Sequence, residues 1–310
     1  MINLRRNKSK SIEKKGINKK VLEIIIIILI VIVTLIFVFK VLVKQKEYSS
    51  KDINIYNEIK ESNEEKYTEK IEEVSYEAKP KMVKANVPIF MYHFILEDYG
   101  DNWDRENFVR PSTLEEQIKY VAENGYESIF LSEVSNLQKY TKPVCFTFDD
   151  CFVYFYNNAF PLFKKYNVKA TIFVITDYIA GENYLTEDQI KEMSDSGLID
   201  VQSHTAKHLD LTTLNDEELE YQIKGSKDRL EKITGKKLNT ICYPYGRFNN
   251  KVLNVCKKYY EYGTAMDGGS LYYNSNTTDL YTLDRIYATR SMNISEFTSY
   301  LKQAYVNVTW

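Results

Sequence analysis

Two patterns of hydrophobic and polar positions divide the chain. Over residues 24–39 every side chain is apolar except Thr34, and flanking apolar residues extend the run over 21–43, interrupted only by Glu23 and Lys40 near its ends. A helix of about 20 apolar residues is long enough to cross the hydrocarbon core of a bilayer. From Val87 onward, short β-branched and aromatic runs alternate instead with amphipathic segments. That alternation predicts strands that alternate with helices.

The apolar run follows a strongly basic segment. Arg5, Arg6 and six lysines precede it, opposed only by Glu13. The positive-inside rule places such a flank in the cytoplasm. The run is longer than a signal-peptide core and no small-residue cleavage site follows it, which favours an uncleaved anchor over a cleaved signal peptide. We therefore expect residues 1–20 to be a cytoplasmic tail, residues 21–43 to be a single transmembrane anchor in the cell membrane, and the remainder to be extracellular.

Residues 44–86 are dominated by Lys and Glu, and their apolar positions are sparse. This composition predicts a charged stalk that serves as a spacer. A coiled coil is the alternative, but the heptads do not persist. We place the boundary of the folded domain at residue 87, so that this domain spans 87–310.

Within that domain the pattern predicts eight strands, at 88–96, 128–131, 144–148, 170–176, 199–203, 240–243, 263–266 and 283–289. Helices are predicted at 113–124, 158–166, 186–196, 216–234, 250–260 and 295–303. Repeated strand-then-helix units favour an α/β fold with a parallel sheet. The length and the number of strands favour one barrel-like domain.

Charge and cysteine content narrow the function classes. Residues 1–46 hold 11 basic and 2 acidic side chains, whereas the remainder holds 30 basic and 41 acidic ones. An acidic body argues against nucleic acid as a partner, because phosphate binding needs a basic surface. Four cysteines in 310 residues do not make a disulfide scaffold. Cys145 and Cys242 lie on predicted strands, where buried free thiols are favoured over a disulfide between them.

Residues that carry chemistry follow several of the predicted strands. Asp149 and Asp150 follow strand 144–148, and His204 and His208 follow strand 199–203. The only other histidine of the chain, His93, lies beside the first strand. In barrels of this kind the catalytic groups lie at the carboxyl ends of the strands, so we expect these side chains to converge.

An aspartate and two histidines form a three-ligand set of the kind that holds zinc in hydrolytic sites. The second aspartate can then take a proton from water. Each element alone is a weak signal, because two histidines four apart occur on surface helices and paired aspartates occur in turns. Their joint occurrence at strand ends favours a metal-dependent hydrolase.

Three segments resemble motifs of a known family. They are 147–150 (TFDD), 203–208 (SHTAKH) and 243–246 (YPYG), and they are similar to the first three motifs of the polysaccharide deacetylases, carbohydrate esterase family 4, which carry the NodB-homology domain. The resemblance covers residues 86–305. The opening 88–93 (PIFMYH) is similar to the branch that includes the deacetylases of poly-β-1,6-N-acetylglucosamine.

The resemblance implies a distorted (β/α) barrel of the NodB-homology type with fewer than eight repeats. Asp150, His204 and His208 match the residues that hold a divalent metal, most often zinc. Asp149 matches the general base, and the backbone N–H of Tyr245 matches the group that helps to hold the oxyanion. The implied substrate is an N-acetyl group, or in some members an O-acetyl group, on a polysaccharide.

The sequence departs from the common family pattern at two positions. The late histidine that acts as the general acid is missing from 283–290, and we assign that role to His93. Many members carry an arginine that orients the base where this chain has Cys242. Arg285 and Arg290 are the candidates to replace it.

Taken together, these features predict a membrane-anchored, extracellular, zinc-dependent N-deacetylase. Its polysaccharide partner is expected to be poly-N-acetylglucosamine or peptidoglycan. Two alternatives stay open at this point. One is a non-catalytic glycan-binding protein on the same barrel, and the other is an O-acetyl esterase that acts on xylan-like glycans.

Overall fold

The computed structural model describes residues 82–97, 105–266 and 268–309. The chain divides into two units, 1–77 and 78–310, and the fold described below belongs to the second. The predicted tail, the predicted anchor at 21–43 and the stalk as far as residue 81 lie outside the described residues. No helix among the described residues has the length and apolar character needed to cross a membrane.

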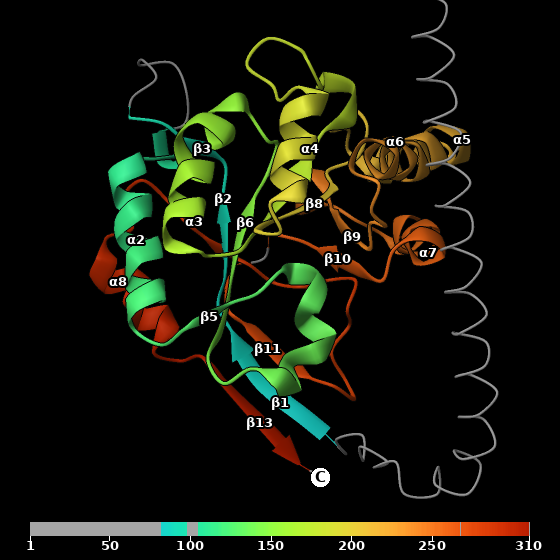
Figure 1. Cartoon of the computed structure of the whole chain (residues 1–310). Helices are drawn as coiled ribbons and strands as arrows, with labels where there is room; N and C mark the ends of the chain where they lie inside the picture. The colour runs from blue at the N-terminus through green and yellow to red at the C-terminus, as the bar shows by residue number, and fades with distance from the viewer. Residues whose placement is uncertain (1–81, 98–104, 267, 310) are drawn as a thin grey trace, which may run out of the picture. The chain divides into compact units, whose positions relative to one another are not determined.

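A curled parallel sheet forms the centre of this domain (Figure 1). Its strands, in spatial order, are β10 (Tyr262–Thr264), β9 (Thr240–Cys242), β8 (Ile199–Ser203), β7 (Ala170–Val174), β6 (Pro143–Phe148), β2 (Ile89–Tyr92) and β12 (Ile286–Tyr287), with β5 (Glu127–Ser128) also paired to β6. A parallel bridge between Thr264 and Leu283 joins β10 to the segment that leads into β12. The two ends of the sheet therefore meet, as expected for a distorted barrel.

Helices cover the outside of this sheet (Figure 1). They are α2 (Pro111–Glu123), α3 (Phe160–Tyr166), α4 (Glu187–Asp195), α5 (Asp216–Glu220), α6 (Ser226–Thr234), α7 (Asn250–Tyr259) and α8 (Ile294–Leu301), with a π-helical turn between α5 and α6. Their beginnings follow from the sequence. The side chains of Thr186, Asn215, Asn249 and Asn293 each accept a hydrogen bond from a backbone N–H in the first turn of α4, α5, α7 and α8, which is ordinary N-cap chemistry.

The strands of the sheet contribute to two apolar clusters. On β6, Phe146 and Phe148 pack with the helix side chains Phe163 and Phe297 in one cluster. Cys145, which directly precedes Phe146 on the strand, belongs to the other cluster. Because successive side chains of a strand point to opposite faces, β6 is buried on both faces, as is typical of parallel sheets covered by helices. This burial holds the carboxyl end of β6 in place.

All four cysteines are buried and free, so the prediction of free thiols at Cys145 and Cys242 is confirmed.

A second, antiparallel sheet was not predicted. It consists of β1 (Met82–Val87) between β11 (Leu271–Asn274) and β13 (Tyr305–Thr309). The folded domain therefore begins at or before Met82, and the boundary that we predicted at residue 87 lies too far along the chain. The reason is the alternation in β1, where Val83 and Ala85 are buried but Lys84 is exposed. In the sequence this short, half-polar strand cannot be distinguished from the charged stalk.

The short pair β3 (Phe94–Ile95) and β4 (Phe108–Val109) forms a third, two-stranded sheet after β2. The remaining short elements are 3₁₀ turns at Arg105–Asn107, Leu131–Lys139, Thr176–Tyr178, Leu211–Thr213 and Pro244–Gly246, and a π-helical turn at Phe155–Ala159 that leads into α3. Several of these turns border the carboxyl ends of the strands, where the predicted site residues lie.

Candidate active site

All six residues predicted to form the site line one cavity of about 560 Å³. They come from the carboxyl ends of four strands: His93 after β2, Asp149 and Asp150 after β6, His204 and His208 after β8, and Tyr245 after β9. The parallel sheet brings these ends to one edge, which confirms that the residues converge. The roles assigned to them stay predictions.

Asp150, His204 and His208 form a cluster that fits a divalent cation. The Oδ1 atom of Asp150 lies 3.5 Å from Nε2 of His204 and 3.6 Å from Nε2 of His208. Three ligands held about 2.1 Å from a tetrahedral zinc ion are about 3.4 Å apart, so the three atoms already have suitable spacing. The Nδ1–H of His204 donates to the carbonyl oxygen of Cys242 at 2.9 Å. This bond fixes the tautomer and leaves Nε2 free to ligate, a common arrangement around metal sites.

A second group of potential ligands, Asp149, His204 and Cys242, also lies close together. It fits a cation less well. Both carboxylate oxygens of Asp149 accept hydrogen bonds from Arg285, and Nδ1 of His204 is already used by the Cys242 carbonyl. The cluster around Asp150 is therefore the better candidate.

The protonation of these groups suits ligation. Burial lowers the pKa of His204 to about 3 and also holds the pKa of His208 below its ordinary value, so both rings are neutral at neutral pH. Burial, followed by repulsion from Asp149, raises the pKa of Asp150 to about 7. A cation at the cluster would reverse that last effect, because its positive charge stabilises the carboxylate.

Asp149 is held by a buried arginine. Nη1 of Arg285 donates to Oδ1 of Asp149 at 2.7 Å, and Nη2 donates to Oδ2 at 2.8 Å. Burial alone would raise the pKa of Asp149, but the guanidinium outweighs it and holds this pKa well below its usual range. Nε of Arg285 also donates to the carbonyl of Ala265, at 3.0 Å. Asp149 is therefore ionised, and Arg285 fixes the orientation of its carboxylate.

Arg285 and Arg290 were the two candidates to replace the family arginine, and the structure distinguishes them. Nη2 of Arg285 lies 3.2 Å from Sγ of Cys242, the residue found where many members have arginine. Arg290 instead donates to the carbonyl of Glu97 at 3.2 Å. The guanidinium that contacts the predicted base therefore comes from the segment that leads into β12.

Backbone strain gathers at the same loops. Five non-glycine residues there adopt positive φ, namely Asp150, Cys151, Thr205, His208 and Tyr245, with angles between 52° and 66°. Such conformations cost roughly 1–3 kcal/mol each and persist where the surroundings enforce them, often at functional sites. Here the Thr205 hydroxyl accepts from the backbone N–H of His208 at 3.1 Å, which holds that turn.

His93 and Tyr245 border the cluster on different sides. The His93 ring meets Tyr287 edge to face, with 5.8 Å between the ring centroids. The Tyr245 ring packs against His208 with 4.6 Å between the ring centroids, and the residue is 56% exposed. Tyr245 is thus placed at the mouth of the cavity.

Sequence reasoning missed the other side chains that line the cavity, which are Phe94, Asn107, Phe152, Tyr184, Met266 and Tyr287. Most are aromatic or apolar, and in sequence such residues are indistinguishable from core. Phe152 carried the one usable signal, because it lies only two positions after the paired aspartates.

Comparisons with known proteins agree with this geometry. A family model described as polysaccharide deacetylase matches residues 137–262. The poly-β-1,6-N-acetyl-D-glucosamine N-deacetylase of Staphylococcus aureus strain MRSA252 is 30% identical over 211 residues, which is 62% of this chain and 72% of that protein.

Solved structures give the same picture. A polysaccharide deacetylase from Bacillus cereus is 34% identical with a TM-score of 0.66, over 70% of this chain and 69% of that one. The Streptococcus pyogenes deacetylase PplD, solved in complex with acetate, is 29% identical with a TM-score of 0.65, over 70% of this chain and 99% of that one. The resemblance inferred from the three motifs is confirmed.

Proposed function

Because this chain belongs to the polysaccharide deacetylase family of carbohydrate esterases, which hydrolyse amide bonds, we propose that it removes N-acetyl groups from poly-N-acetylglucosamine in a metal-dependent reaction. One observation carries the proposal. The Asp150, His204 and His208 cluster lies beside an ionised aspartate whose two oxygens are held by Arg285.

The cation would be held by Asp150, His204 and His208. When bound, a divalent cation supplies Lewis-acid chemistry, which polarises the acetyl carbonyl and makes water acidic enough for a weak base to deprotonate. The donor set of one carboxylate and two neutral imidazoles fits zinc, since it leaves a position open.

Asp149 acts as the general base in this proposal. Its carboxylate lines the cavity and takes the proton of the attacking water. The Arg285 guanidinium keeps the carboxylate ionised before the reaction and orients it through two hydrogen bonds. The same ion pair makes Asp149 a weak base, so it can deprotonate a water molecule only when the pKa of that water has been lowered.

Two further groups complete the reaction. The backbone N–H of Tyr245 stabilises the oxyanion that develops on the acetyl carbonyl, and one such donor is worth on the order of 10²–10³ in rate. His93, on the β2 side of the cavity, donates a proton to the leaving amine. Acetate and a free glucosamine unit are the products.

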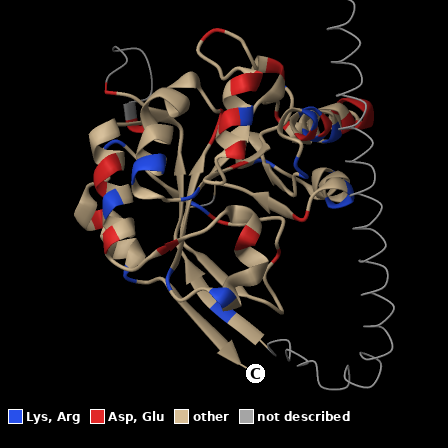
Figure 2. Cartoon of the chain, in the orientation of Figure 1, with Lys and Arg blue, Asp and Glu red and all other residues tan. Residues whose placement is uncertain are grey.

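The substrate assignment rests on the relatives and on charge. The S. aureus relative is named for poly-β-1,6-N-acetyl-D-glucosamine. Among the described residues, neither Lys nor Arg lines the cavity, so a neutral sugar polymer suits it better than an anionic one. Acidic side chains also recur on α2, α4 and α5 (Figure 2).

We further propose that residues 21–43 anchor the protein in the cell membrane, with residues 1–20 in the cytoplasm and the catalytic domain outside. The supporting observations are the apolar run and its basic flank. Labelling of an engineered cysteine at residue 50 in intact cells by a membrane-impermeant reagent tests this topology. Labelling only after lysis would contradict it.

Acetate release by the full chain tests the activity. We expect release from β-1,6-linked N-acetylglucosamine oligomers, abolition of that release by a chelator, and recovery with Zn²⁺. Preference for β-1,4-linked oligomers would point to peptidoglycan-type substrates, and activity only on O-acetylated xylan would support the esterase alternative. A His93→Ala variant with a rate near wild type would refute the assignment of the acid.

A non-catalytic glycan-binding role is disfavoured. A decayed site would have lost the base, the ligands or their support, and here Asp149, its Arg285 partner and the three candidate ligands are all in place. Sugar binding that persists unchanged in Asp149→Asn, with no acetate release from wild type, would restore that alternative.

A further inference from the structure

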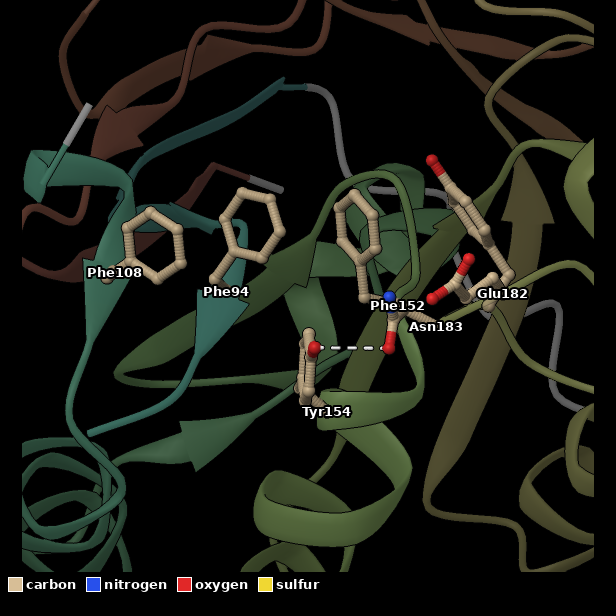
Figure 3. A pocket seen from close by; sticks show the side chains of 7 residues that line it. Phe94, Phe108, Phe152, Tyr154, Glu182 and Asn183 are labelled. Atoms are coloured by element: carbon tan, nitrogen blue, oxygen red, sulfur yellow. Dashed lines mark hydrogen bonds between the residues drawn. The ribbon is translucent and has the colours of Figure 1, made fainter. Parts of the chain in front are cut away.

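A second, smaller cavity of about 190 Å³ adjoins the candidate active site. It is lined by Phe94, Phe108, Phe152, Tyr154, Glu182, Asn183 and Tyr184 (Figure 3). Phe94, Phe152 and Tyr184 also line the catalytic cavity. A polymer held in one cavity therefore places its neighbouring unit at the other.

One wall of this cavity is a row of aromatic rings. The Phe94 ring stacks on Phe108 at 4.4 Å and on Phe152 at 4.3 Å, and Phe152 packs on Tyr184 at 4.8 Å. Both faces of Phe94 and Phe152 are thus covered by neighbouring rings, which stand side by side in Figure 3, and this leaves their ring edges for contact with a ligand. Ring edges are apolar C–H surface, which suits the carbon skeleton of a sugar.

Beside Phe152, one end of the cavity is rich in hydrogen-bond acceptors (Figure 3). The hydroxyl of Tyr154 donates to Oδ1 of Asn183 at 3.2 Å, and the carboxylate of Glu182 lies next to them (Figure 3). Among the described residues, none forms a hydrogen bond or an ion pair with Glu182. Neither Lys nor Arg lines this cavity in the described part of the chain.

The backbone holds this end against the catalytic loop. Phe152 and Tyr184 form an antiparallel bridge, and the N–H of Val153 donates to the carbonyl of Asn183 at 2.7 Å. Glu182 is therefore carried by a segment bonded to Phe152 and Val153, which lie two and three positions after Asp150. The backbone that carries its carboxylate thus has a defined position relative to the site.

A carboxylate that has neighbouring acceptors, and neither a partner nor a nearby cation in the part of the chain that the structure describes, attracts a positively charged donor. A glucosamine unit that has lost its acetyl group carries an amine that is protonated near neutral pH, as α-amino groups are, and an ammonium offers three donors. We propose that this cavity binds an already deacetylated glucosamine unit next to the N-acetylglucosamine unit that is being hydrolysed, with its ammonium on Glu182.

This proposal rests on the proposed function and extends it to the pattern of the product. A unit that has just been deacetylated becomes the preferred neighbour of the next substrate unit. Deacetylation then favours chains that already contain amines. Because Glu182 is exposed, the expected gain is modest, about two- to fivefold, as for exposed ion pairs.

The test uses the full chain and two β-1,6-linked tetramers, one fully N-acetylated and one with a single glucosamine unit. Initial rates of acetate release per acetyl group at low substrate concentration report kcat/KM. We expect the partly deacetylated tetramer to react about two- to fivefold faster. High salt should reduce this ratio, because it screens exposed charges.

Glu182→Gln should bring the ratio of the two rates to about one. Glu123→Gln, a substitution at an exposed glutamate at the end of α2, is the matched control and should keep the wild-type ratio. A wild-type ratio of one or less, or a ratio that survives Glu182→Gln, would overturn the proposal. A faster reaction of the fully acetylated tetramer would instead indicate that the cavity takes a neutral neighbour.

A binding measurement separates this proposal from the proposed function. The fully deacetylated glucosamine tetramer should bind the wild-type chain, and Glu182→Gln should weaken that binding about two- to fivefold. If no acetylated oligomer releases acetate but this binding difference persists, the proposed function fails and the subsite stands. If acetate is released but Glu182→Gln changes neither the ratio nor the binding, the subsite fails and the function stands.

Discussion

Arg285 and Asp149 form a bidentate ion pair that is almost completely buried, with side-chain exposures of 0% and 2%. The two residues are separated by 136 positions in sequence. Removing one partner of such a pair leaves an uncompensated buried charge, which is far more costly than losing a surface ion pair.

Arg285→Met should therefore lower the free energy of unfolding by about 3–5 kcal/mol and also reduce acetate release. Arg285→Lys should have a stability and an activity between those of wild type and Arg285→Met, because an ammonium cannot donate to both carboxylate oxygens in the way a guanidinium does. Urea unfolding and initial rates measure the two effects. Arg290→Gln is the control, since the Arg290 guanidinium donates to the backbone carbonyl of Glu97. This substitution should change the free energy of unfolding by no more than about 0.5 kcal/mol. Equal effects at both positions would argue against a special role for Arg285.

The adjacent aspartates should separate metal binding from proton transfer. Asp149→Asn should keep bound zinc but lower kcat by about 10²–10⁴, the usual contribution of a general base. Asp150→Asn should lose the zinc itself, because it removes the carboxylate of the cluster. Metal content after dialysis and acetate release distinguish the two. Loss of zinc in both variants, or in neither, would show that the roles are assigned wrongly.

Part of the stability that the folded protein loses at low pH should come from Glu133. Its carboxylate accepts hydrogen bonds from the Phe130 N–H at 2.8 Å, the Tyr140 hydroxyl at 2.9 Å and the Lys169 ammonium at 3.0 Å. Burial alone would raise the pKa of Glu133, but these partners outweigh it and the pKa is lowered. A carboxyl with a depressed folded-state pKa stabilises the protein above its unfolded pKa of about 4.3 and loses this effect as pH falls through the folded value.

Glu133→Gln should thus cost about 1–3 kcal/mol at pH 7, and the difference from wild type should shrink below about pH 4. Urea unfolding between pH 3 and pH 7 measures it. Acetate release at pH 7 should not change, because the residue does not line the catalytic cavity. A difference that stays constant with pH would mean that the charge of Glu133 is not the source of the effect.

The start of the domain can be tested by truncation. A chain that begins at residue 78 should retain the stability of the domain, whereas one that begins at residue 87 loses nearly all of β1. That strand pairs on both sides, for example Val83 with Val308 and Lys84 with Asn274, and buries Val83 and Ala85. Burial of one valine is worth about 1.5–3 kcal/mol, so the shorter chain should show a clearly lower Tm. Equal Tm values would place β1 outside the cooperative unit.

The strand ends could be predicted because their chemistry is local. Asp149 and Asp150 follow a run of buried residues, and the spacing of His204 and His208 is visible without a structure. The parallel fold then requires convergence, since carboxyl ends of parallel strands share one edge. The helices followed from the same regular pattern, and their N-caps Asn215 and Thr186 mark where they begin.

What could not be predicted depends on long-range pairing. The choice between Arg285 and Arg290 needs the register of β12 against β2, in which Ile286 pairs with Phe90. Strands β11 and β13 are short, and their partner β1 lies far away in sequence, as the pairs Lys84 with Asn274 and Val83 with Val308 show, so nothing local marks them. The aromatic row at Phe94 and Phe152 looks like core in the sequence, because only the fold reveals which rings border a cavity.

The bridge between Thr264 and Leu283 has a consequence for how activity arises during synthesis. Arg285 lies two residues after Leu283, in a part of the barrel that is synthesised late. Until this bridge has formed, Asp149 lacks the positive charge of Arg285 and cannot remain ionised in an interior that excludes water. Under the proposed mechanism, a nascent or prematurely terminated polypeptide that lacks Arg285 is therefore expected to release no acetate, even when its three motifs are complete.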